Sequence, residues 1–353
     1  MFKISFCTTC MNRLSHLKQT LKRNILDNED YPNLEFILLD YNSTDGLKEY
    51  VRSELHTFIT SKKLVYYRTE EPKKYNMSHS RNLAYKLATG DIVCNIDADN
   101  FTGAGFATYI NGVFKKNGNV FLSTHDEGGV KKDVLGRICV KKKDFLAVNG
   151  YDETMKHYGF DDYDFLNRLQ FLGLTKKVIS APQFLNAITH STAERMENFI
   201  TVKLEKLLIK YISPAESTLH FLYTNNTCAV GTIVNNHNFN AITSDVALKK
   251  ALKYRFSIAE KSWAEGGWQT NDDSIIISIN NNPLKLDRKE QRWLEDKMQN
   301  KYRDISSTVI IEEMIFFLHQ LSNRLIMESN CLKGISKVNN AGFGEAIVFK
   351  ELY

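Results

Sequence analysis

Two aspartates separated by one residue, Asp97 and Asp99, are the clearest candidates for chemistry in this sequence. They directly follow the apolar run DIVCNI at 91–96, which predicts a buried strand. Carboxylate oxygens are preferred ligands of Mg²⁺ and Mn²⁺, so such a pair at a strand end can hold a divalent cation or contact a ribose. Acidic pairs at strand ends are also common as solvated groups, so this pair alone assigns no function.

A second acidic cluster, Asp161, Asp162 and Asp164, opens a helix predicted at 161–172, with Gly173 at the position of a C-terminal cap. The positive end of the helix dipole favours carboxylates in the first turn and helps to keep them ionised. The cluster therefore suits either a proton acceptor or a simple helix start. The residues themselves leave both interpretations open.

Strands alternating with helices are predicted to position these clusters. Such alternation indicates parallel strands with crossover helices, and ligands then lie beyond the carboxyl ends of the strands. The turn-forming residues YNSTDG after Asp40 occupy one of these ends. The predicted elements are strands at 3–8, 35–40, 64–68 and 91–96, and helices at 14–26, 78–88 and 161–172.

Four segments in order resemble glycosyltransferase family 2 and its galactosyltransferase-type relatives, and the resemblance covers residues 1–192. The segments are KISFCTTCMNR, FILLDYNSTDG, SRNLAYKLATGDIVCNIDADN and NGYDETMKHYGFDDYDFLNRL. The resemblance implies an α/β class: the GT-A nucleotide-sugar-binding fold, a mixed sheet flanked by helices. It also implies metal-dependent, inverting transfer of a sugar from a nucleoside-diphosphate sugar to an acceptor hydroxyl.

The resemblance assigns catalytic and metal-binding roles to individual residues. It makes Asp162 the catalytic base and Asp161 an acceptor contact, although the family normally has Glu-Asp where this sequence has Asp161-Asp162. The shorter first side chain weakens the acceptor assignment more than the base assignment. It also implies that Asp99 and His190 hold the cofactor, Mn²⁺ or Mg²⁺. A packed or surface histidine is the alternative for His190.

The same resemblance implies a donor site at the strand ends. Asp40 and the Asn42-Ser43 turn would hold the base and ribose. Arg13 and Arg81 would lie near the donor, where a guanidinium can hold a phosphate in a bidentate manner, with structural ion pairs as the alternative. The opening strand has Cys7-Thr8 in place of the proline usual in the family. The expected donor-binding residues are Thr8, Arg13, Asp40, Asn42, Ser43, Arg81 and Asp97.

The sequence changes in character after residue 200, which predicts two domains: residues 1–205 as the catalytic domain and 206–353 as an α+β accessory domain of unassigned role. Asn225-Asn226 indicates a hairpin turn, and residues 274–280 (SIIISIN) indicate a strand. Two helices are expected to follow. The second carries apolar residues at helical spacing, namely Ile310, Met314, Phe317, Leu321 and Leu325.

Composition and charge restrict the class of protein. Hydrophobic residues make up 43% and charged residues 25% of the 353 residues, which disfavours disordered and fibrous classes. The net charge of +5 is mild and compatible with an anionic diphosphate donor. The six cysteines are scattered, so reduced thiols are expected. The start MFKISFCTTCMNR has too few apolar residues for a signal-peptide core, so a cytoplasmic location is expected, with the inner face of the membrane as the alternative. No stretch has the length of a membrane span.

Partners and rival functions follow from this interpretation. The expected partners are a nucleoside-diphosphate sugar, with a UDP-sugar favoured, and a saccharide or glycoconjugate acceptor in polysaccharide synthesis. Nucleic acid is not expected, while peripheral membrane contact and homo-oligomers stay open. A nucleotidyltransferase would need a glycine-rich loop, and CTTCMNR contains no glycine. A catalytically degenerate carbohydrate-binding or scaffold protein on the same fold is the alternative.

Overall fold

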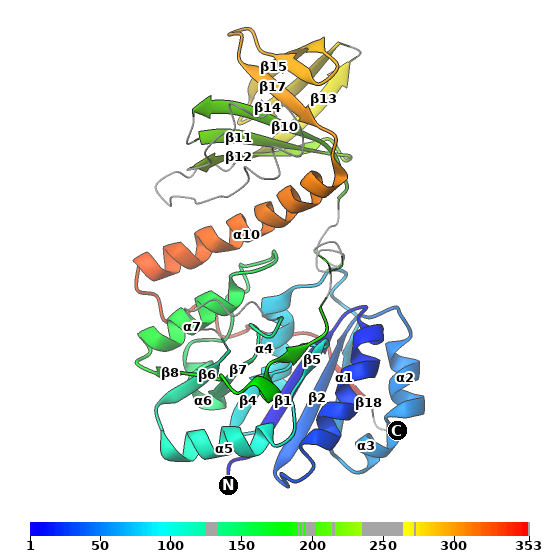
Figure 1. Ribbon diagram of the computed structural model, residues 1–353, viewed down its shortest axis with the longest axis vertical. Helices are drawn as coiled ribbons and strands as arrows, with labels where there is room; N and C mark the ends of the chain where they lie inside the picture. The colour runs from blue at the N-terminus through cyan, green and yellow to red at the C-terminus, as the bar shows by residue number, and fades with distance from the viewer. Residues whose placement is uncertain are drawn as a thin grey trace. The chain divides into compact units, whose positions relative to one another are not determined.

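The structure is a computed structural model. It describes residues 1–124, 133–189, 191, 194, 202–213, 216–234, 264–271 and 273–351. The chain divides into two compact units, a first unit of Met1–Phe199 with His319–Tyr353 and a second unit of Ile200–Leu318 (Figure 1). The C-terminal residues therefore rejoin the first unit. The sequence-based division into 1–205 and 206–353 did not include this return.

The first unit is built on a mixed sheet with the described strand order β18-β3-β2-β1-β4-β7-β6-β8. β1 runs parallel to β2 and β4, while β7 runs antiparallel to β4 and β6. The α/β class with a mixed sheet is confirmed. The strands are β1 Ile4–Cys10, β2 Leu34–Tyr41, β3 Leu64–Thr69, β4 Ile92–Asn95, β6 Val120–Ser123, β7 Ile138–Lys141, β8 Thr175–Val178 and β18 Phe349–Glu351.

The register of the central strands brings their carboxyl ends to one edge of the sheet. Cys10 pairs with Asp40 across β1 and β2, and Cys7 pairs with Asn95 across β1 and β4. The chain segments that follow these three strands therefore start close together. This is the edge at which open α/β sheets bind ligands.

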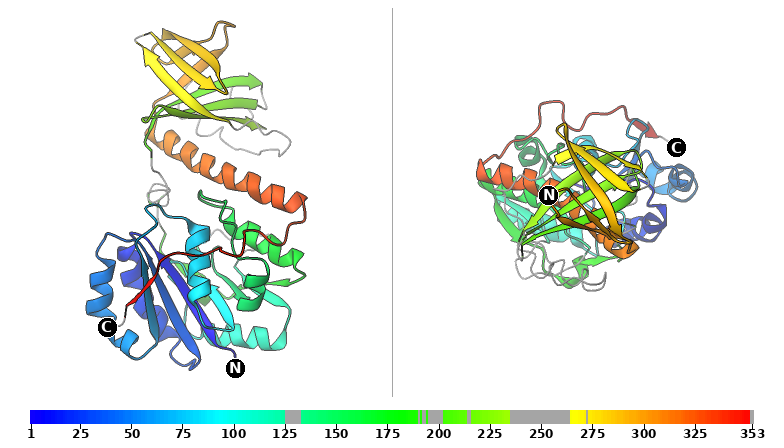
Figure 2. Two further views of the ribbon diagram at one scale, coloured as in Figure 1. Left: turned by 180° about the vertical axis from the view of Figure 1, so that it is seen from behind. Right: turned by 90° about the horizontal axis from the view of Figure 1, so that it is seen from above.

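Helices cover both faces of this sheet and enclose a separate apolar core on each (Figures 1 and 2). One core is formed by α1, α2, α3 and α5, the other by α4, α6 and α7. The helices are α1 Leu14–Asp27, α2 Leu47–Glu54, α3 His56–Thr60, α4 Met77–Leu87, α5 Phe106–Lys116, α6 Lys142–Ala147 and α7 Asp161–Phe171. A 3₁₀ turn at Pro182–Phe184 and the short pair β5 (Asn100–Phe101) and β9 (Asn186–Ala187) complete this part.

Local sequence signals explain where two helices near the site begin and end. The side chain of Asn76 accepts a hydrogen bond from the His79 backbone at 3.0 Å, which caps the start of α4. Gly173 follows α7 with a φ of 92°, the left-handed conformation that favours glycine after a helix. The helices predicted at 78–88 and 161–172 are confirmed, each within one residue at either end.

The second unit is a closed barrel of antiparallel strands. Its interior is apolar and includes Leu208, Trp268, Ile277 and Leu286. The predicted hairpin is present, because Asn226 lies between β11 and β12 with a φ of 64°. The strands are β10 Leu204–Ser213, β11 Glu216–Tyr223, β12 Thr227–Val234, β13 Ala264–Asn271, β14 Ser274–Ile279, β15 Asn282–Glu290, β16 Trp293–Glu295 and β17 Lys301–Ile305.

The expectation of two helices after residue 280 is wrong for the first of them. Residues 282–305 form β15, β16 and β17, because each of these strands pairs with a neighbour in the barrel. Tertiary pairing here overrides the helix-forming residues of this charged segment. The second expected helix is present as α10, Thr308–Leu332.

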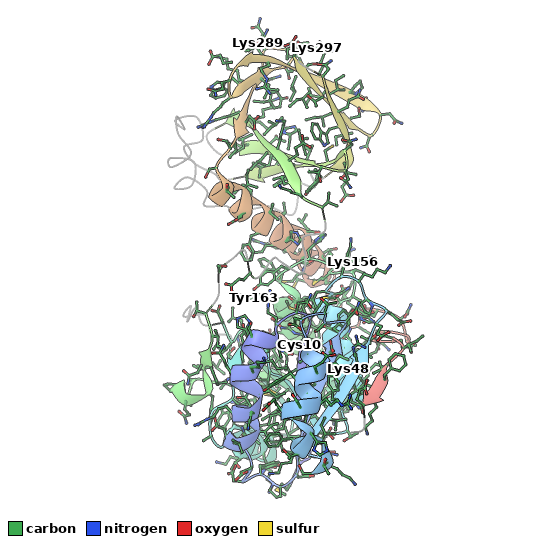
Figure 3. All side chains as sticks on the ribbon, turned by 90° about the vertical axis from the view of Figure 1, so that its right-hand side faces the viewer. Cys10, Lys48, Lys156, Tyr163, Lys289 and Lys297 are labelled. Carbon is green, nitrogen blue, oxygen red and sulfur yellow. The ribbon has the colours of Figure 1, made fainter. Side chains whose placement is uncertain are left out.

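The C-terminal end of the chain lies in the first unit. After α10, the chain continues to β18, which pairs antiparallel with β3 at the sheet edge (Figure 2). All six cysteines are free, and Cys10 is buried at the end of β1 (Figure 3). Among the described residues, no helix is long and apolar enough to cross a membrane.

Candidate active site at the strand ends

The turns that follow β1 and β2 are joined by hydrogen bonds. Asn12 donates its backbone N–H to Ser43 Oγ at 3.2 Å, and its side-chain oxygen accepts from the Thr44 N–H at 2.8 Å. Asn12 and Asn42 both have positive φ values, 55° and 61°, which asparagine tolerates better than most residues. The two turns therefore form one fixed surface beside the strand ends.

Asp40 supports this surface from inside. It is fully buried, and its carboxylate accepts from the Ser43 N–H at 2.7 Å and from the Tyr66 hydroxyl at 2.7 Å. Arg68 lies 3.5 Å from the same carboxylate. Burial raises the pKa of Asp40, against the lowering effect of these partners. Both carboxylate oxygens of Asp40 thus contact protein groups. Asp40 therefore stabilises the turn that was predicted to hold the ribose.

The other predicted donor residues surround the same edge. Thr8 is buried within β1, and Asn42 donates its side-chain amide to the Pro72 carbonyl at 2.9 Å. Arg13, at the start of α1, is half-buried and donates to the carbonyls of Asn12 and Glu194. These residues lie in the first unit at the carboxyl ends of β1 and β2. Their contacts with a donor stay a prediction.

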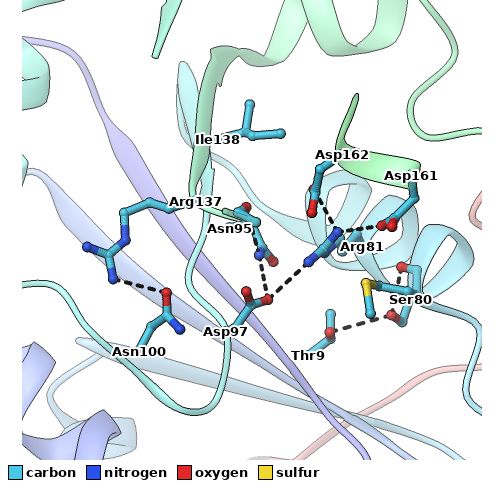
Figure 4. A network of polar contacts seen from close by, with 12 residues as sticks. Thr9, Ser80, Arg81, Asn95, Asp97, Asn100, Arg137, Ile138, Asp161 and Asp162 are labelled. Atoms are coloured by element: carbon cyan, nitrogen blue, oxygen red, sulfur yellow. Dashed lines mark hydrogen bonds and ion pairs between the residues drawn. The ribbon is translucent and has the colours of Figure 1, made fainter. Parts of the chain in front are cut away.

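Arg81 joins the two acidic clusters found in the sequence (Figure 4). One guanidinium nitrogen donates to Asp161 Oδ2 at 2.7 Å and to Asp162 Oδ1 at 2.8 Å, and the other donates to Asp97 Oδ1 at 3.2 Å. Arg81 is supplied by α4, Asp97 follows β4, and Asp161 and Asp162 begin α7. The fold therefore brings residues up to 81 positions apart into one site.

The two aspartates at the start of α7 differ in how far their side chains are exposed to solvent. The side chain of Asp161 is 3% exposed and that of Asp162 is 18% exposed, while Arg81 is 3% exposed. A proton acceptor must reach a substrate hydroxyl, which favours Asp162 for that role. Asp161 was expected to contact the acceptor, but its burial leaves little surface for such a contact.

Burial is the largest influence on the pKa values of these carboxyl groups. It raises the pKa of Asp162 to about 7, with Asp161 and Asp97 acting in the same direction and Arg81 opposing them. Burial also raises the pKa of Asp161. The sequence argument that the helix dipole keeps this base ionised therefore missed the larger effect. A carboxylate with a pKa near neutrality is well matched to general-base catalysis at neutral pH.

Asp97 is the most accessible member of the network, with 31% of its side chain exposed. Asn95 donates to its Oδ1 at 2.7 Å and to the Gly136 carbonyl at 3.0 Å. A Cβ atom at Gly136 would lie 2.6 Å from both Arg81 and Asp97, so a larger residue here would require this ion pair to shift. Gly136 thus permits the close approach of its chain segment to the site.

Asp99 lies beside a second buried arginine. Asn100 donates to Asp99 Oδ1 at 2.7 Å, and Arg137 donates to Asn100 Oδ1 at 3.1 Å and to the Phe101 carbonyl at 2.9 Å. Burial lowers the pKa of Arg137. Arg137 therefore holds the chain that carries Asp99 in place, although it contacts Asp99 through Asn100.

The residues at this edge suit a divalent cation in their chemistry. Asp97 and Asp99 are hard oxygen donors and both are partly exposed. Asp97, Asp161 and Asp162 face one guanidinium, so the network contains more carboxyl groups than positively charged groups. No group of three or more His, Cys, Asp or Glu residues with metal-ligand geometry occurs in the described part of the chain. His190 lies outside the described residues.

Several residues of the site had no signal in the sequence. Asn95, Gly136 and Arg137 are ordinary residue types at unremarkable spacing, and their roles arise only when distant segments meet. Arg81 was expected to contact a donor phosphate, but its contacts are carboxylates. A buried arginine could have been inferred only from an excess of carboxylates predicted at one sheet edge.

Family models match most of the first unit. Residues 5–135 match the model described as glycosyl transferase family 2, and residues 130–194 match the model described as N-terminal domain of galactosyltransferase. The predicted resemblance is confirmed, and with it the expectation of a glycosyltransferase domain. No curated protein matches the chain.

Solved structures that resemble the chain include a mannosyltransferase, PcManGT from Pyrobaculum calidifontis in complex with GDP-Man and Mn²⁺. It is 21% identical, with a TM-score of 0.46, covering 55% of this chain and 60% of that one. S. aureus TarS 1-349 in complex with UDP is 18% identical, with a TM-score of 0.44, covering 55% and 62%. TarS 1-349 with UDP-GlcNAc is 15% identical, with a TM-score of 0.40, covering 55% and 64%. The chain thus spans less than two thirds of each of these structures.

Proposed function

We propose that the protein transfers a sugar from a nucleoside-diphosphate sugar to an acceptor hydroxyl, with inversion at the anomeric carbon. The observation that carries this proposal is the ion-paired network in which Arg81 bridges Asp97 to Asp161 and Asp162. It joins the acidic motif after β4 to the acidic start of α7. In a glycosyltransferase these two segments would serve the donor and the acceptor.

Asp162 is the proposed general base. Its carboxylate is the more exposed of the pair at the start of α7, and its pKa of about 7 lets it accept a proton near neutral pH. Asp162 takes the proton of the acceptor hydroxyl as that oxygen forms a bond to the anomeric carbon. The bond from that carbon to the diphosphate oxygen breaks on the opposite face, so the configuration inverts.

Arg81 and Asp161 prepare that base. Arg81 fixes the orientation of the Asp162 carboxylate, and Asp161 raises its pKa through like charge. Because Asp161 is nearly buried, we assign it mainly an electrostatic role and only a minor share of the acceptor contact. Arg81 is occupied by carboxylates, so its charge serves the network more than the donor phosphates.

The donor is proposed to lie across the ends of β1, β2 and β4. The turn that contains Asn42 and Ser43, held by Asp40, would contact the ribose and base, with Thr8, Arg13 and Asp97 completing the surface. A UDP-sugar is favoured, and the solved structures similar to this chain include complexes with GDP-Man, UDP and UDP-GlcNAc. The acceptor would be a saccharide or glycoconjugate.

Asp99 is the proposed ligand of a divalent cation, Mn²⁺ or Mg²⁺, with His190 as a further ligand. Mg²⁺ in proteins is often held by one or two carboxylates together with substrate phosphates, so a small set of protein ligands is sufficient. When bound, such a cation neutralises the charge that develops on the departing diphosphate. Asn100 keeps the Asp99 carboxylate oriented for this contact.

A panel of nucleotide sugars tests the proposed function. UDP-glucose, UDP-galactose, UDP-GlcNAc and GDP-mannose are each added with Mn²⁺, and thermal unfolding and release of the nucleoside diphosphate are measured. Ligand at 100 times its Kd stabilises a protein by about 2.7 kcal/mol, which is readily detected. We expect one donor to stabilise the protein and to be hydrolysed slowly or transferred. A bound donor that is never turned over would favour the carbohydrate-binding alternative.

A further inference from the structure

The loop that leads into the proposed base has an unusual backbone. Residues 148–160 connect α6 to α7, and the last two of them, Gly159 and Phe160, have φ values of 86° and 66°. A bulky residue such as phenylalanine rarely adopts a positive φ, which costs energy unless the surroundings hold it. Asp161 and Asp162 follow directly. Their placement therefore depends on whatever holds this loop.

Asn323 of α10 holds the end of this loop. Its side chain is buried, and its amide donates to the His157 carbonyl at 2.6 Å and to the Gly159 carbonyl at 2.7 Å. The aliphatic part of Gln320, one turn earlier on α10, lies next to Gly159. Two carbonyls in the strained segment thus receive hydrogen bonds from one side chain of the C-terminal helix.

Asn330, two helical turns further along α10, contacts the loop and α7 together. Its amide donates to Asp152 Oδ2 at 3.0 Å and to Asp164 Oδ1 at 2.9 Å. Asp164 also accepts from Arg168 at 2.7 Å, so this part of α7 is tied to both the loop and α10. The first turn of α7, which contains the proposed base, is fixed by this arrangement.

Asn339, beyond the end of α10, holds the beginning of the loop. Its amide donates to the Asn149 carbonyl at 2.8 Å and to the Tyr151 carbonyl at 2.6 Å, and its side-chain oxygen accepts from the Glu153 N–H at 3.0 Å. The Glu153 carboxylate in turn accepts from Asn82 at 2.9 Å. Asn82 is adjacent to Arg81 on α4, so the loop is also fixed relative to the arginine.

We propose that Asn323, Asn330 and Asn339 are positioning residues for the proposed active site, and that the C-terminal segment from His319 is an integral part of the catalytic unit. Asn339 and Asn330 hold the first part of the loop before α7, and Asn323 holds its end. They thereby fix Asp161 and Asp162 against Arg81. This inference rests on the proposed role of Asp162 and extends it to residues that touch no substrate.

The two units provide an internal control for testing this proposal. The three tryptophans, Trp263, Trp268 and Trp293, all lie within 200–318, so tryptophan fluorescence reports the second unit alone. Hydrogen exchange followed by mass spectrometry reports the loop and the remainder of the first unit separately. A change confined to residues 148–164 can thus be distinguished from a general loss of structure.

Two variants remove the contacts at opposite ends of the loop. Asn323→Ala deletes both hydrogen bonds to His157 and Gly159, and Asn339→Gly deletes the side chain while glycine accommodates the φ of 54° at that position. Asn28→Ala is the matched control, because Asn28 is equally buried but bonds to Thr102 and Ala107. Asn340→Ala is a second control in the same segment, since Asn340 is exposed.

The first measurement needs no substrate. Carboxyl titration of Asp162 by NMR in the full-length protein should give a pKa near 7 in the wild type and in both controls. In Asn323→Ala and Asn339→Gly, water reaches the released carboxylate, so we expect the pKa to fall toward the ordinary value of about 4. Exchange should accelerate at 148–164 alone. An unchanged pKa together with unchanged exchange of the loop would overturn the proposal.

The second measurement uses whichever donor the nucleotide-sugar panel identifies. Both variants should lower kcat by about tenfold or more while the donor Kd stays within about twofold, because donor contacts lie on other segments. Asn28→Ala should retain kcat even if it loses comparable stability. Equal losses of kcat in Asn28→Ala and Asn323→Ala would overturn the positioning role. If no donor is turned over, the proposed function fails, while the titration still decides whether these asparagines position Asp162.

Discussion

Arg81 donates a hydrogen bond to Asp162 at 2.8 Å across 81 positions of the sequence, and the same nitrogen lies 2.7 Å from Asp161. One nearly buried guanidinium thus balances the carboxylates of two consecutive residues and, through its other nitrogen, Asp97 as well. Removing one partner of a buried ion pair leaves uncompensated charge in the interior. The network is therefore expected to matter for folding as well as for catalysis.

Arg81→Met should destabilise the first unit by about 3–5 kcal/mol at pH 8. The loss should be smaller at pH 5, because protonated carboxyls need no positive partner. Hydrogen exchange of α4 and α7 at both pH values measures the effect, and Arg52→Met, at an exposed arginine, is the control. Equal stability of wild type and Arg81→Met at pH 8 would contradict the ion-pair account.

The activity should depend on pH through Asp162. Burial raises its pKa to about 7, and the base works only when ionised, so kcat/KM should rise with pH and level off above about 7.5. Below the pKa, kcat/KM should fall about tenfold per pH unit. Asp161→Asn should move the midpoint to lower pH, because Asp161 raises this pKa through like charge. A profile that is flat from pH 5 to 9 would exclude Asp162 as the titrating base.

A pair of histidines predicts that the C-terminal helix loosens in acid. His319 and His157 lie with their Nδ1 atoms 3.3 Å apart, and burial, with the charge of His157, lowers the pKa of His319 to about 3. The unfolded chain binds a proton near pH 6.5, so the stability contributed by neutral His319 is present above that pH and is lost as the pH falls below it.

The free energy of unfolding can fall by about 1.4 kcal/mol for each pH unit below pH 6.5. Amide exchange in residues 319–332, compared at pH 7.5 and pH 5 after correction for intrinsic rates, measures it. His319→Asn should reduce the difference between the two pH values, whereas tryptophan fluorescence of the second unit should report the same transition in both proteins. An identical pH dependence of exchange in wild type and variant would assign the effect to other groups.

Removal of the metal should abolish transfer. Excess EDTA should stop sugar transfer, and added Mn²⁺ should restore it, because a divalent cation neutralises the departing diphosphate. Asp99→Asn should weaken the binding of Mn²⁺ and of the donor together, measured by calorimetry. Asp30→Asn, at an exposed position on the same unit, should leave both unchanged. Full activity in excess EDTA would remove the metal from the mechanism.

The elements that carry the site could be predicted because their signals are local. The apolar run before Asp97 and the acidic first turn with Gly173 at the end of α7 are short patterns that any strand or helix of this kind produces. The same holds for the segment after Asp40, in which Asn42 and Gly46 adopt the positive φ values common in turns. Where the sequence signal and the tertiary contacts agree, the prediction and the structure agree.

The contacts that complete the site could not be predicted, because they join segments that are distant in sequence. Asn323 reaches Gly159 across 164 positions, and no periodicity or composition links them. At residues 282–305, distant contacts instead change the type of secondary structure. The first of two helices was expected after residue 280, but pairing within the barrel selects strands there. Partners that are far apart in sequence decide both outcomes.

Turnover by Asp162→Asn, measured beside donor binding, tests the central claim most directly. Asparagine keeps the shape of the side chain but cannot accept the proton, and a general base contributes about 10²- to 10⁴-fold to the rate. We expect kcat to fall by that factor while the donor Kd, measured by calorimetry, changes less than about twofold. If Asp162→Asn keeps more than about a tenth of the wild-type kcat, another group accepts the proton and the proposed mechanism is wrong.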